Sequence, residues 1–393
     1  GIRTPGALQP DLLAGCVPVN LFAQSLYQNV VGDFASQAER DYLFDSRDFD
    51  TTYKQTVISA YIQGSVFELP GGTAKVVLGG EYRDDTLIST PDAAAAEGLF
   101  FGFFPDQGAE GSKDIFEAFG EIDLPLISGE TLAEDVRLNL SGRITEDEFY
   151  GTNGTYSVKL GWRPFQPLLL KLSYGTSFRS PNLRELFLAG QSGFGGVFDP
   201  CAVPANAYAP LNGGYQASQD NREQNVLDNC RREGRDPTTV GTDGANTVTT
   251  PSVEITSGGS LALDPETSDS FTTGFAFAEA FGPVDFSFNF NYYNISVKGA
   301  IAEPSAAFIV NQCFTRDDGV RSTFCDFIDY DPSGRRLISD VFAGFVNINE
   351  ELVEGLDLNT NISTDVAAFG KDVRLGLNVR ANHLIARDTT FLD

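Results

Sequence analysis

Long stretches of strict two-residue alternation constrain this chain more than any other feature. The clearest runs from Val284 to Lys298, where apolar residues alternate with polar ones: Val284, Phe286, Phe288, Phe290 and Tyr292 against Asp285, Ser287, Asn289 and Asn291. Successive side chains of a strand point to opposite faces, so the pattern predicts a strand with one apolar and one polar face. Most such stretches are about 15 residues long, well above the usual ~5–6 residues of a strand.

Ten such strands follow one another, and their connections alternate in length. We predict strands over 53–69, 73–89, 113–127, 133–149, 155–163, 168–178, 267–280, 284–298, 341–364 (with a bulge near 350–351) and 371–386. The short connections are 70–72, 128–132, 164–167, 281–283 and 365–370, and several contain the Gly and Pro of tight turns. The long connections are 90–112, 179–265 and 300–340. The connection 150–154 is an exception, because it is short where the alternation of lengths calls for a long one.

The strand that begins at Leu168 ends abruptly. Pro181 cannot donate to a ladder, and it disfavours helical geometry at Ser180. A short helix is expected to follow, capped by Ser180 or Asn182, with Glu185 in its first turn. No strand pattern then appears before about Glu266, and a second short helix is predicted over 34–44.

The polar faces carry charges on strand after strand, which two architectures explain. These charged residues are Lys75, Glu81, Glu117, Glu121, Arg137, Arg143, Lys159, Lys171, Asp285, Arg374 and Arg380. In a soluble antiparallel sandwich this face meets water. In a transmembrane barrel it lines a wet lumen, and the apolar face meets lipid. Strand length, lumen charge and the alternating loops favour an all-β, antiparallel transmembrane barrel, with aromatic girdles that include Tyr82, Trp162, Tyr174 and Tyr292.

The charge balance excludes several partners. The chain has 27 basic and 54 acidic residues, a net charge of −27. A protein that grips a nucleic-acid backbone needs a basic face, so we predict no nucleic-acid partner. Docking on an anionic membrane surface is disfavoured for the same reason. The balance suits a soluble acidic surface or polar loops that face water.

Cysteine spacing predicts disulfides rather than a metal centre. None of the five cysteines forms a C-x-x-C pair, which makes zinc or thioredoxin chemistry a weak reading. Pairing by proximity joins Cys201 to Cys230 and Cys313 to Cys325, closes loops within two of the long connections and leaves Cys16 over. Disulfides form in exported proteins, whereas the alternative is five reduced thiols in a cytosolic protein.

The sequence offers little for catalysis, and we predict no enzyme, metal or cofactor. His383 is the only histidine, and no hydrolase, zinc-protease or phosphate-loop motif occurs. The stretch 329–334 resembles half of a calcium loop but lacks the distal glutamate, so we interpret it as a turn. Two carboxylate pairs imitate a glycosidase site, but repeated lumen charge explains them equally well: Glu117 with Glu121, and Glu146 with Glu148.

Several segments together resemble the TonB-dependent outer-membrane receptors. Residues 174–187 contain Phe178-Arg179-Ser180-Pro181 and a following Glu185-Leu186, which is similar to that family's strand-to-loop signature. Leu263–Ser270 resembles its Asn-Pro-Glu-Thr-Ser segment. Further similarities lie in residues 290–295 with Lys298, in Gly355-Leu356-Asp357-Leu358 and in Gly15–Phe22. Their order and spacing hold over most of the chain.

The resemblance implies a specific architecture that this chain contains only in part. The family has a plug domain of ~150 residues and a barrel of 22 strands, of which about ten are recognisable here. We therefore expect residues 1–52 to form an extracellular loop segment with a short helix and residues 53–393 to form part of the barrel. The plug and the C-terminal strands are expected to lie outside this sequence, and Cys16 would then pair with an upstream cysteine.

The resemblance also implies a function and a compartment. The expected function is import of a scarce nutrient (a ferric siderophore, cobalamin or an oligosaccharide) across the outer membrane of a Gram-negative bacterium. The expected partners are the TonB complex, reached through the plug, the ligand and outer-membrane lipid. The short turns would be periplasmic and the long loops extracellular.

Candidate contacts with the ligand lie in the long loops. Phe100, Phe101, Phe103 and Phe104 are suited to stacking on a sugar or an aromatic chelator, although a local loop core would explain them as well. Arg179 is a further candidate. The motif Phe178, Arg179, Pro181 and Glu185 is expected to organise the long loop, and we favour this role for Arg179.

Two rival functions remain open at this stage. One is an adhesin or a structural barrel that imports nothing. The other is a secreted soluble β-protein. A plug and an energy-coupling segment encoded in the whole gene would favour import over the first rival. Recovery in the soluble fraction without heat-modifiable gel mobility would favour the second.

Overall fold

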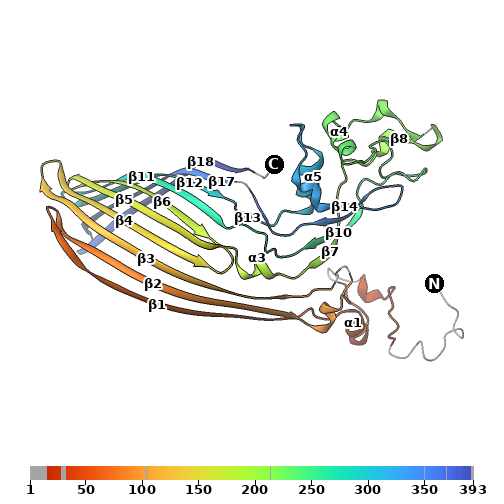
Figure 1. Cartoon of the computed structure of the whole chain (residues 1–393), viewed down its shortest axis with the longest axis horizontal. Helices are drawn as coiled ribbons and strands as arrows, with labels where there is room; N and C mark the ends of the chain where they lie inside the picture. The colour runs from red at the N-terminus through yellow and green to blue at the C-terminus, as the bar shows by residue number, and fades with distance from the viewer. Residues whose placement is uncertain are drawn as a thin grey trace.

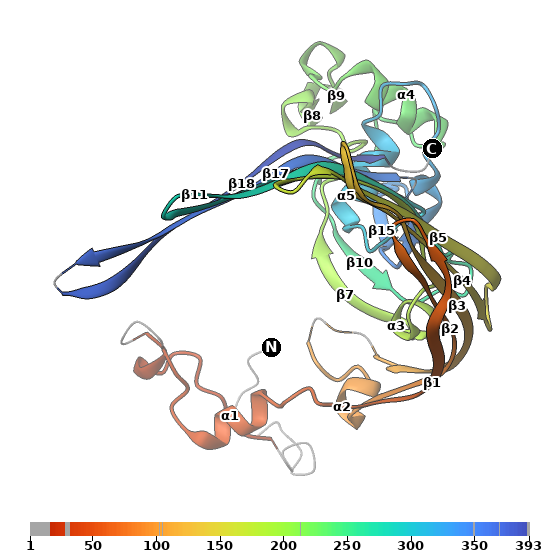
Figure 2. The same ribbon diagram turned by 90° about the vertical axis from the view of Figure 1, so that its left-hand side faces the viewer.

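One antiparallel sheet of ten strands, joined in chain order, dominates the molecule (Figure 1). A computed structural model describes residues 16–27, 32–101, 103, 105–212, 214–348, 350–368 and 370–390. The strands of the large sheet are β1 (Phe49–Leu69), β2 (Gly72–Pro91), β3 (Ala109–Glu130), β4 (Ala133–Asp147), β5 (Gly151–Phe165), β6 (Leu168–Arg179), β11 (Glu266–Phe281), β12 (Val284–Lys298), β17 (Glu350–Ala368) and β18 (Lys371–Thr390). With β1 and β18 as its edges, the sheet forms an open, curved arc (Figure 2).

The all-β, antiparallel architecture is confirmed, but one predicted strand is wrong. Residues 338–342 form a short strand, β15, of a different sheet, and the long strand β17 begins only at Glu350. The register shift in β17 lies between Glu354 and Gly355 rather than near 350–351. The predicted strand runs from the end of β15 into β17, and both of these elements are strands. A periodic pattern does not reveal which sheet a strand joins, so the pattern alone merged them.

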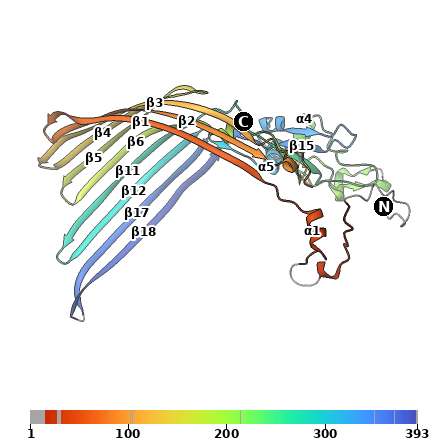
Figure 3. The same ribbon diagram turned by 90° about the horizontal axis from the view of Figure 1, so that it is seen from below.

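The two ends of the large sheet differ. Five tight turns lie at one end, which we call the turn end (Figure 3): those between β1 and β2, β3 and β4, β5 and β6, β11 and β12, and β17 and β18. Gly282 shows the tightness of these turns, because its φ of +64° falls in the left-handed region that favours glycine. The longer connections all leave the opposite end, which we call the loop end.

The strand registers separate an apolar face from a polar face. A row of apolar residues crosses six neighbouring strands on one face: Val76, Ile122, Leu140, Val158, Tyr174 and Phe271. Further along this face, Phe275 of β11 lies against Phe288 and Phe290 of β12, with ring centroids 5.6 and 5.8 Å apart. The opposite, polar face carries the charged side chains, so the predicted sidedness of the sheet is confirmed.

Two long connections fold together into a second unit, which we call the loop head (residues 191–260 and 301–348). Its four-stranded sheet has the order β14 (Ile328–Tyr330), β15 (Ile338–Phe342), β10 (Ser252–Ser257) and β7 (Gln191–Gly196). The prediction that no strand lies between 179 and 265 is therefore wrong. Strands such as β7 are short and glycine-rich, so their own sequence carries little pattern.

The loop head has its own buried core and two disulfides. Nineteen residues from both connections make up this core, including Val253, Phe314 and Val341. Disulfides join Cys201 to Cys230 and Cys313 to Cys325, the pairs predicted from proximity in the sequence. Cys16 is exposed and lies in neither disulfide.

The helices are short and lie outside the large sheet. They are α1 (Gln37–Leu43), α2 (Ala93–Ala96), α3 (Leu183–Phe187), α4 (Gln224–Arg232) and α5 (Ala306–Phe314), with single turns at η2 (Gln24–Leu26), η3 (Ala205–Ala207), η4 (Pro210–Asn212), η5 (Ala217–Gln219) and η6 (Thr323–Phe327). The remaining two-residue strands are β8 (Tyr208–Ala209), β9 (Gly214–Tyr215), β13 (Ile301–Ala302) and β16 (Val346–Asn347). Among the described residues, none of the helices has the length and apolar character to cross a membrane.

Candidate functional site

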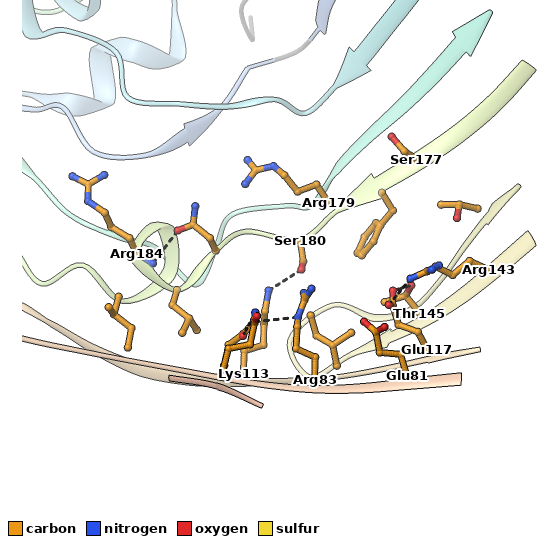
Figure 4. Close-up of a pocket in the computed structure, with 18 of the residues that line it drawn as sticks. Glu81, Arg83, Lys113, Glu117, Arg143, Thr145, Ser177, Arg179, Ser180 and Arg184 are labelled. Atoms are coloured by element: carbon orange, nitrogen blue, oxygen red, sulfur yellow. Dashed lines mark hydrogen bonds and ion pairs between the residues drawn. The ribbon is translucent and has the colours of Figure 1, made fainter. Parts of the chain in front are cut away.

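A cavity of about 770 Å³ opens against the polar face near the loop end (Figure 4). Side chains of β1 to β6 and of α3 line this cavity, which we call the charged cavity. Its five cations outnumber its three carboxylates: Arg83, Lys113, Arg143, Arg179 and Arg184 against Glu81, Asp85 and Glu117. Its volume falls within the range of ligand sites for small molecules.

Two of the cations pair with carboxylates of the cavity wall. Arg143 Nη1 lies 2.6 Å from Glu117 Oε2, and Thr145 Oγ1 donates to Glu117 Oε1 at 2.8 Å. Arg83 Nε lies 3.2 Å from Asp85 Oδ2. The first pair joins β4 to β3 and the second lies within β2, and in both the carboxylate balances the charge of the cation, so neither cation is wholly available to a ligand.

Lys113 fixes the beginning of the long loop to the sheet. Its side chain is 4% exposed, and Nζ donates to Ser180 Oγ at 2.7 Å and to the Pro181 carbonyl at 2.8 Å. The buried carboxylate of Asp147 completes the arrangement, with Oδ2 3.4 Å from Nζ. Because a buried ammonium needs such partners, this cluster fixes where the chain leaves β6.

Arg179 links the points at which the two connections of the loop head meet the large sheet. Its guanidinium bonds Glu185, at 3.0 Å from Nη1 to Oε2, and also Glu266 at the start of β11. Glu266 Oε1 in turn accepts from the Ile301 backbone N–H at 2.7 Å. This geometry supports the loop-organising role favoured for Arg179, although the side chain also borders the cavity.

The helix after Pro181 explains the rest of this motif. Asn182 is its N-cap and accepts from the Glu185 N–H at 3.0 Å, while Glu185 Oε2 accepts from the Asn182 N–H at 2.7 Å. This reciprocal capping box leaves Asn182, not Ser180, as the cap. Pro181 is buried, and Phe178 borders the charged cavity.

Arg184 is a cation of this cavity that the sequence pattern did not single out. It forms no ion pair with any residue that the structure describes, and its guanidinium carbon lies 5.1 Å from the centre of the Phe345 ring. Figure 4 shows Arg184 and Arg179 across the cavity from Lys113 and Arg83. Alternation could not reveal Arg184, because it lies on a helix and only its packing places it beside the strands.

The phenylalanines of the 90–112 connection do not share one environment. Phe101 is fully exposed, and Phe100 is half-buried. The Phe103 ring lies 4.9 Å from the Arg47 guanidinium, and its backbone bridges to Gly193 of the loop head. Phe104 lies outside the described residues. Ligand stacking on these rings stays a prediction, with Phe101 the most accessible.

Little in the described residues suggests a metal site. They contain no group of three or more His, Cys, Asp or Glu side chains arranged to hold an ion. The stretch 329–334 includes the turn between β14 and β15, where Asp331 Oδ1 accepts from the Ser333 N–H at 2.7 Å. Its interpretation as a turn therefore fits the structure.

An open antiparallel arc with an outward apolar face, a charged concavity and long loops at one end defines a segment of an outer-membrane-type barrel. Comparison with protein families agrees: the family described as "TonB dependent receptor-like, beta-barrel" matches residues 18–391. The chain belongs to this family. No curated protein sequence matches it.

Solved structures of outer-membrane receptors align with this chain at low sequence identity. The ferric enterobactin receptor PfeA of Pseudomonas aeruginosa, a mutant in complex with enterobactin, is 14% identical with a TM-score of 0.50, and the match covers 86% of this chain and 36% of PfeA. The siderophore receptor PirA of P. aeruginosa is 13% identical over 85% of this chain and 49% of PirA, with a TM-score of 0.45. The Serratia marcescens hemophore receptor HasR, a double mutant with HasA and heme, is 14% identical over 87% of this chain and 42% of HasR, with a TM-score of 0.46. The chain thus spans less than half the length of these receptors.

Proposed function

We propose that this chain belongs to an outer-membrane importer that captures a small anionic nutrient, of the ferric siderophore type, and takes it up with energy from the TonB complex. Family membership supports nutrient import. The charged cavity supports an anionic cargo, because four of its five cations are already paired with carboxylates whereas Arg184 has no carboxylate partner among the described residues. The unpaired guanidinium of Arg184 in the cavity lining is the observation that carries the proposal.

The chemistry of the cargo follows from the donors present. Guanidinium groups present planar forks that bind anionic oxygens, whereas neutral sugars need no such charge. A ferric chelate surrounds its metal with oxygens, many of them anionic. Of the three cargo classes implied by the resemblance, the siderophore therefore fits this cavity better than an oligosaccharide or cobalamin.

Loop orientation is part of the same proposal. The loop end carries both disulfides and the charged cavity, and the turn end carries only tight turns. Disulfides form in exported compartments, and outer-membrane barrels keep their short turns in the periplasm. The loop head would therefore face the medium and the charged cavity would receive solute from outside.

Titration calorimetry on the receptor expressed from its whole gene tests the cargo. We expect ferric enterobactin to bind and the neutral trisaccharide raffinose not to bind. Arg184→Ala should weaken binding about 10- to 150-fold, since a charge-assisted hydrogen bond contributes about 1.5–3 kcal/mol. The control is Arg163→Ala, because Arg163 lies at the turn end and donates to the Gln166 carbonyl. Equal effects of the two variants, or binding of raffinose alone, would contradict the proposal.

Uptake separates import from the rival of a non-importing adhesin or structural barrel. Cells that express the receptor should accumulate iron from radiolabelled ferric enterobactin, and this accumulation should stop when the proton gradient is dissipated. Surface binding that is never followed by accumulation would favour the non-importing rival.

A further inference from the structure

One cation of the charged cavity is held differently from the rest. Four cations pair with carboxylates: Arg83, Lys113, Arg143 and Arg179. Arg184 has no such partner among the described residues, and its guanidinium carbon instead lies 5.1 Å from the centre of the Phe345 ring. An ion pair fixes a side chain and also balances its charge, whereas an aromatic ring attracts a cation through its quadrupole and leaves the net charge in place.

The contact with the ring leaves the hydrogen-bond donors of Arg184 available. Aromatic rings stack against the flat face of a guanidinium, and anionic oxygens accept from the N–H groups around its edge. Of the described residues, Arg184 lines the charged cavity and Phe345 does not (Figure 4). The ring therefore supports the cation from outside the cavity and does not occupy the space of a ligand.

The large sheet fixes the backbone that carries Arg184. The Arg184 N–H donates to the Asn182 side chain at 2.9 Å, within the capping box of α3. On the same helix, Phe187 packs against Phe149 of the turn between β4 and β5, with ring centroids 5.7 Å apart. A Cβ added to Gly111 of β3 would collide with the Phe187 ring, so the helix lies directly on the strands. What the sheet leaves open is the direction of the long Arg184 side chain.

The loop head fixes the ring through one intervening peptide unit. The Gly259 N–H donates to the Leu188 carbonyl, just after α3, at 2.7 Å, and the Gly258 carbonyl accepts from the Phe345 N–H at 3.4 Å. The Gly258 carbonyl and the Gly259 N–H belong to the same trans peptide, in which the two groups point in opposite directions. This peptide therefore joins the end of the helix on one side to Phe345 on the other.

Glycine allows the main chains to approach closely at this joint. A Cβ added to Gly259 would lie 2.7 Å from the carbonyl carbon of Leu186, and one added to Gly344 would lie 2.9 Å from the Gly258 carbonyl oxygen. Nonbonded carbon atoms prefer a separation of about 3.5–4.0 Å, so a side chain at either position would push the layers apart. The joint between α3 and the loop head is therefore tight, which fixes the ring relative to the helix.

A side chain that is already ordered binds a ligand more tightly. Arginine has many rotamers, and a contact that restricts them in the free protein reduces the entropy lost on binding. A cation–π contact at an exposed site corresponds to about a two- to fivefold change in an equilibrium constant. The contribution of the Phe345 ring to binding should therefore be modest and measurable.

The geometry points to Phe345 as a positioning residue, which holds the guanidinium of Arg184 at the wall of the charged cavity and leaves its charge and its N–H donors to the anionic cargo. This inference deepens the proposed function and rests on it. It gives the loop head a part in binding a cargo that Phe345 does not contact. In the competing arrangement, Arg184 only shields the Phe345 ring from water and takes its direction from the cargo.

Titration calorimetry with ferric enterobactin tests this in the receptor expressed from its whole gene. Phe345→Leu keeps an apolar side chain and removes the ring, so we expect the affinity to fall about two- to fivefold. Phe345→Tyr keeps the ring and should retain the parent affinity. In an Arg184→Ala background, Phe345→Leu should have no further effect, because the ring acts only through Arg184. An unchanged affinity in Phe345→Leu, an equal loss in both backgrounds, or a loss in Phe345→Tyr as large as in Phe345→Leu would overturn the inference.

The matched control is Phe119→Leu. The Arg143 guanidinium carbon lies 5.0 Å from the centre of the Phe119 ring, but the Glu117 carboxylate also holds this arginine. Loss of the Phe119 ring should therefore leave the affinity for ferric enterobactin unchanged. If Phe119→Leu weakened binding as much as Phe345→Leu, the effect would not be specific to the arginine that lacks a carboxylate, and the inference would be wrong.

Chemical modification gives a second measurement that needs no cargo. Phenylglyoxal modifies accessible guanidinium groups, and peptide mass spectrometry reports the rate at each arginine. Phe345→Leu should raise the rate at Arg184 about two- to fivefold, Phe345→Tyr should not, and the rate at Arg163 should stay the same in both variants. An unchanged rate at Arg184 in Phe345→Leu would overturn the inference. Failure of ferric enterobactin to bind would reject the proposed cargo and leave this measurement decisive for the ring.

Discussion

The large sheet and the loop head place their apolar residues in opposite ways. The loop head buries a core of 19 residues and contains both disulfides. Most large apolar side chains of the sheet are instead exposed or half-buried on its outer face, among them Leu78, Phe116 and Leu160. One polypeptide therefore contains a unit with its apolar side chains buried inside, as in a water-soluble protein, and a sheet with its apolar side chains on the outside.

The difference teaches which solvent each region is built for. A soluble unit gains its stability by removing apolar surface from water, as the loop head does. A barrel wall in lipid has no such need, because hydrocarbon is as apolar as its own side chains. Its backbone groups must still be paired, and the long antiparallel ladders supply those bonds. Substitutions should therefore act by different rules in the two regions.

The largest expected effect is loss of the buried ion pair of the loop head. Arg235 Nη1 donates to Asp199 Oδ1 at 2.9 Å, both side chains are fully buried, and the guanidinium carbon lies 4.6 Å from the Tyr330 ring centre. Asp199→Ala leaves the cation unpaired, which should cost about 3–5 kcal/mol of loop-head stability. Limited proteolysis should then cut the head while the barrel keeps its heat-modifiable gel mobility.

The control for that variant is Asp228→Ala, whose partner Arg231 lies on the surface of the same head. An exposed pair of this kind contributes about 0–1 kcal/mol, so resistance to protease should persist. If Asp199→Ala also abolished the heat-modifiable form, the separation between head and sheet would be wrong.

Removal of a disulfide should come next in size. The Cys201–Cys230 disulfide has a sequence separation of 29 residues, and the Cys313–Cys325 disulfide one of 12. Chain-entropy arithmetic assigns them roughly 3.6 and 2.8 kcal/mol. Replacing the first pair with serine should therefore lower the denaturant midpoint of the head more than replacing the second. The reverse order would show that native packing, rather than loop length, sets their contributions.

Charge on the apolar face of the sheet should disturb membrane insertion. Phe288 contacts Phe275 on this face, and Asn289 beside it lies on the polar face. Phe288→Arg should cost about 2–4 kcal/mol, because the charge would face lipid. Asn289→Arg should cost far less, because its charge would face the wet side. Folding yield in lipid vesicles measures both, and similar yields would contradict the assignment of the two faces.

The smallest expected effect is a pH dependence within the loop head. Burial raises the pKa of Asp340, and the facing carboxylates Glu254 and Asp329 raise it further, against a hydrogen bond from Thr256. A raised pKa means that the folded head favours the protonated acid. Its contribution to stability is complete below the unfolded pKa of about 3.9 and is lost as pH rises through the folded value.

Asp340→Asn should remove this dependence. At pH 7 the variant should be more stable by about 0.5–1 kcal/mol, because like charges opposite one another in a sheet are unfavourable. Its denaturation midpoint should vary less between pH 4 and 7 than that of the parent head. Asp220, whose pKa is lowered to about 2 chiefly by Arg222, contributes in the opposite direction and serves as an internal contrast. An unchanged pH profile would contradict the assignment to Asp340.

Much of the sheet could be predicted from sequence, because alternation is a local property. Val284–Lys298 shows this best, since its predicted and observed bounds coincide. The failure at 341–364 has the same origin, because Val341 alternates correctly but is buried in the loop head. Two short cysteine separations also sufficed for the disulfides, since nearby cysteines on the same loop meet readily.

The candidate site was only partly predictable. The Pro181 motif and Glu185 were recognised, and the bonds of Arg179 support its loop-organising role. Lys113 was placed at the start of a strand without any indication of its contact with Ser180, 67 residues away. Arg184 escaped notice because its helix follows no alternation.

By itself, the sequence determined the strands, their two faces and their turns, since the two-residue period of a strand is written in neighbouring residues. Only the tertiary structure decided that two distant connections form one head and that five cations share one cavity. Those outcomes depend on strand registers and on contacts such as Arg179 with Glu266, 87 residues apart. Such contacts arise from packing across the whole chain, which no local pattern records.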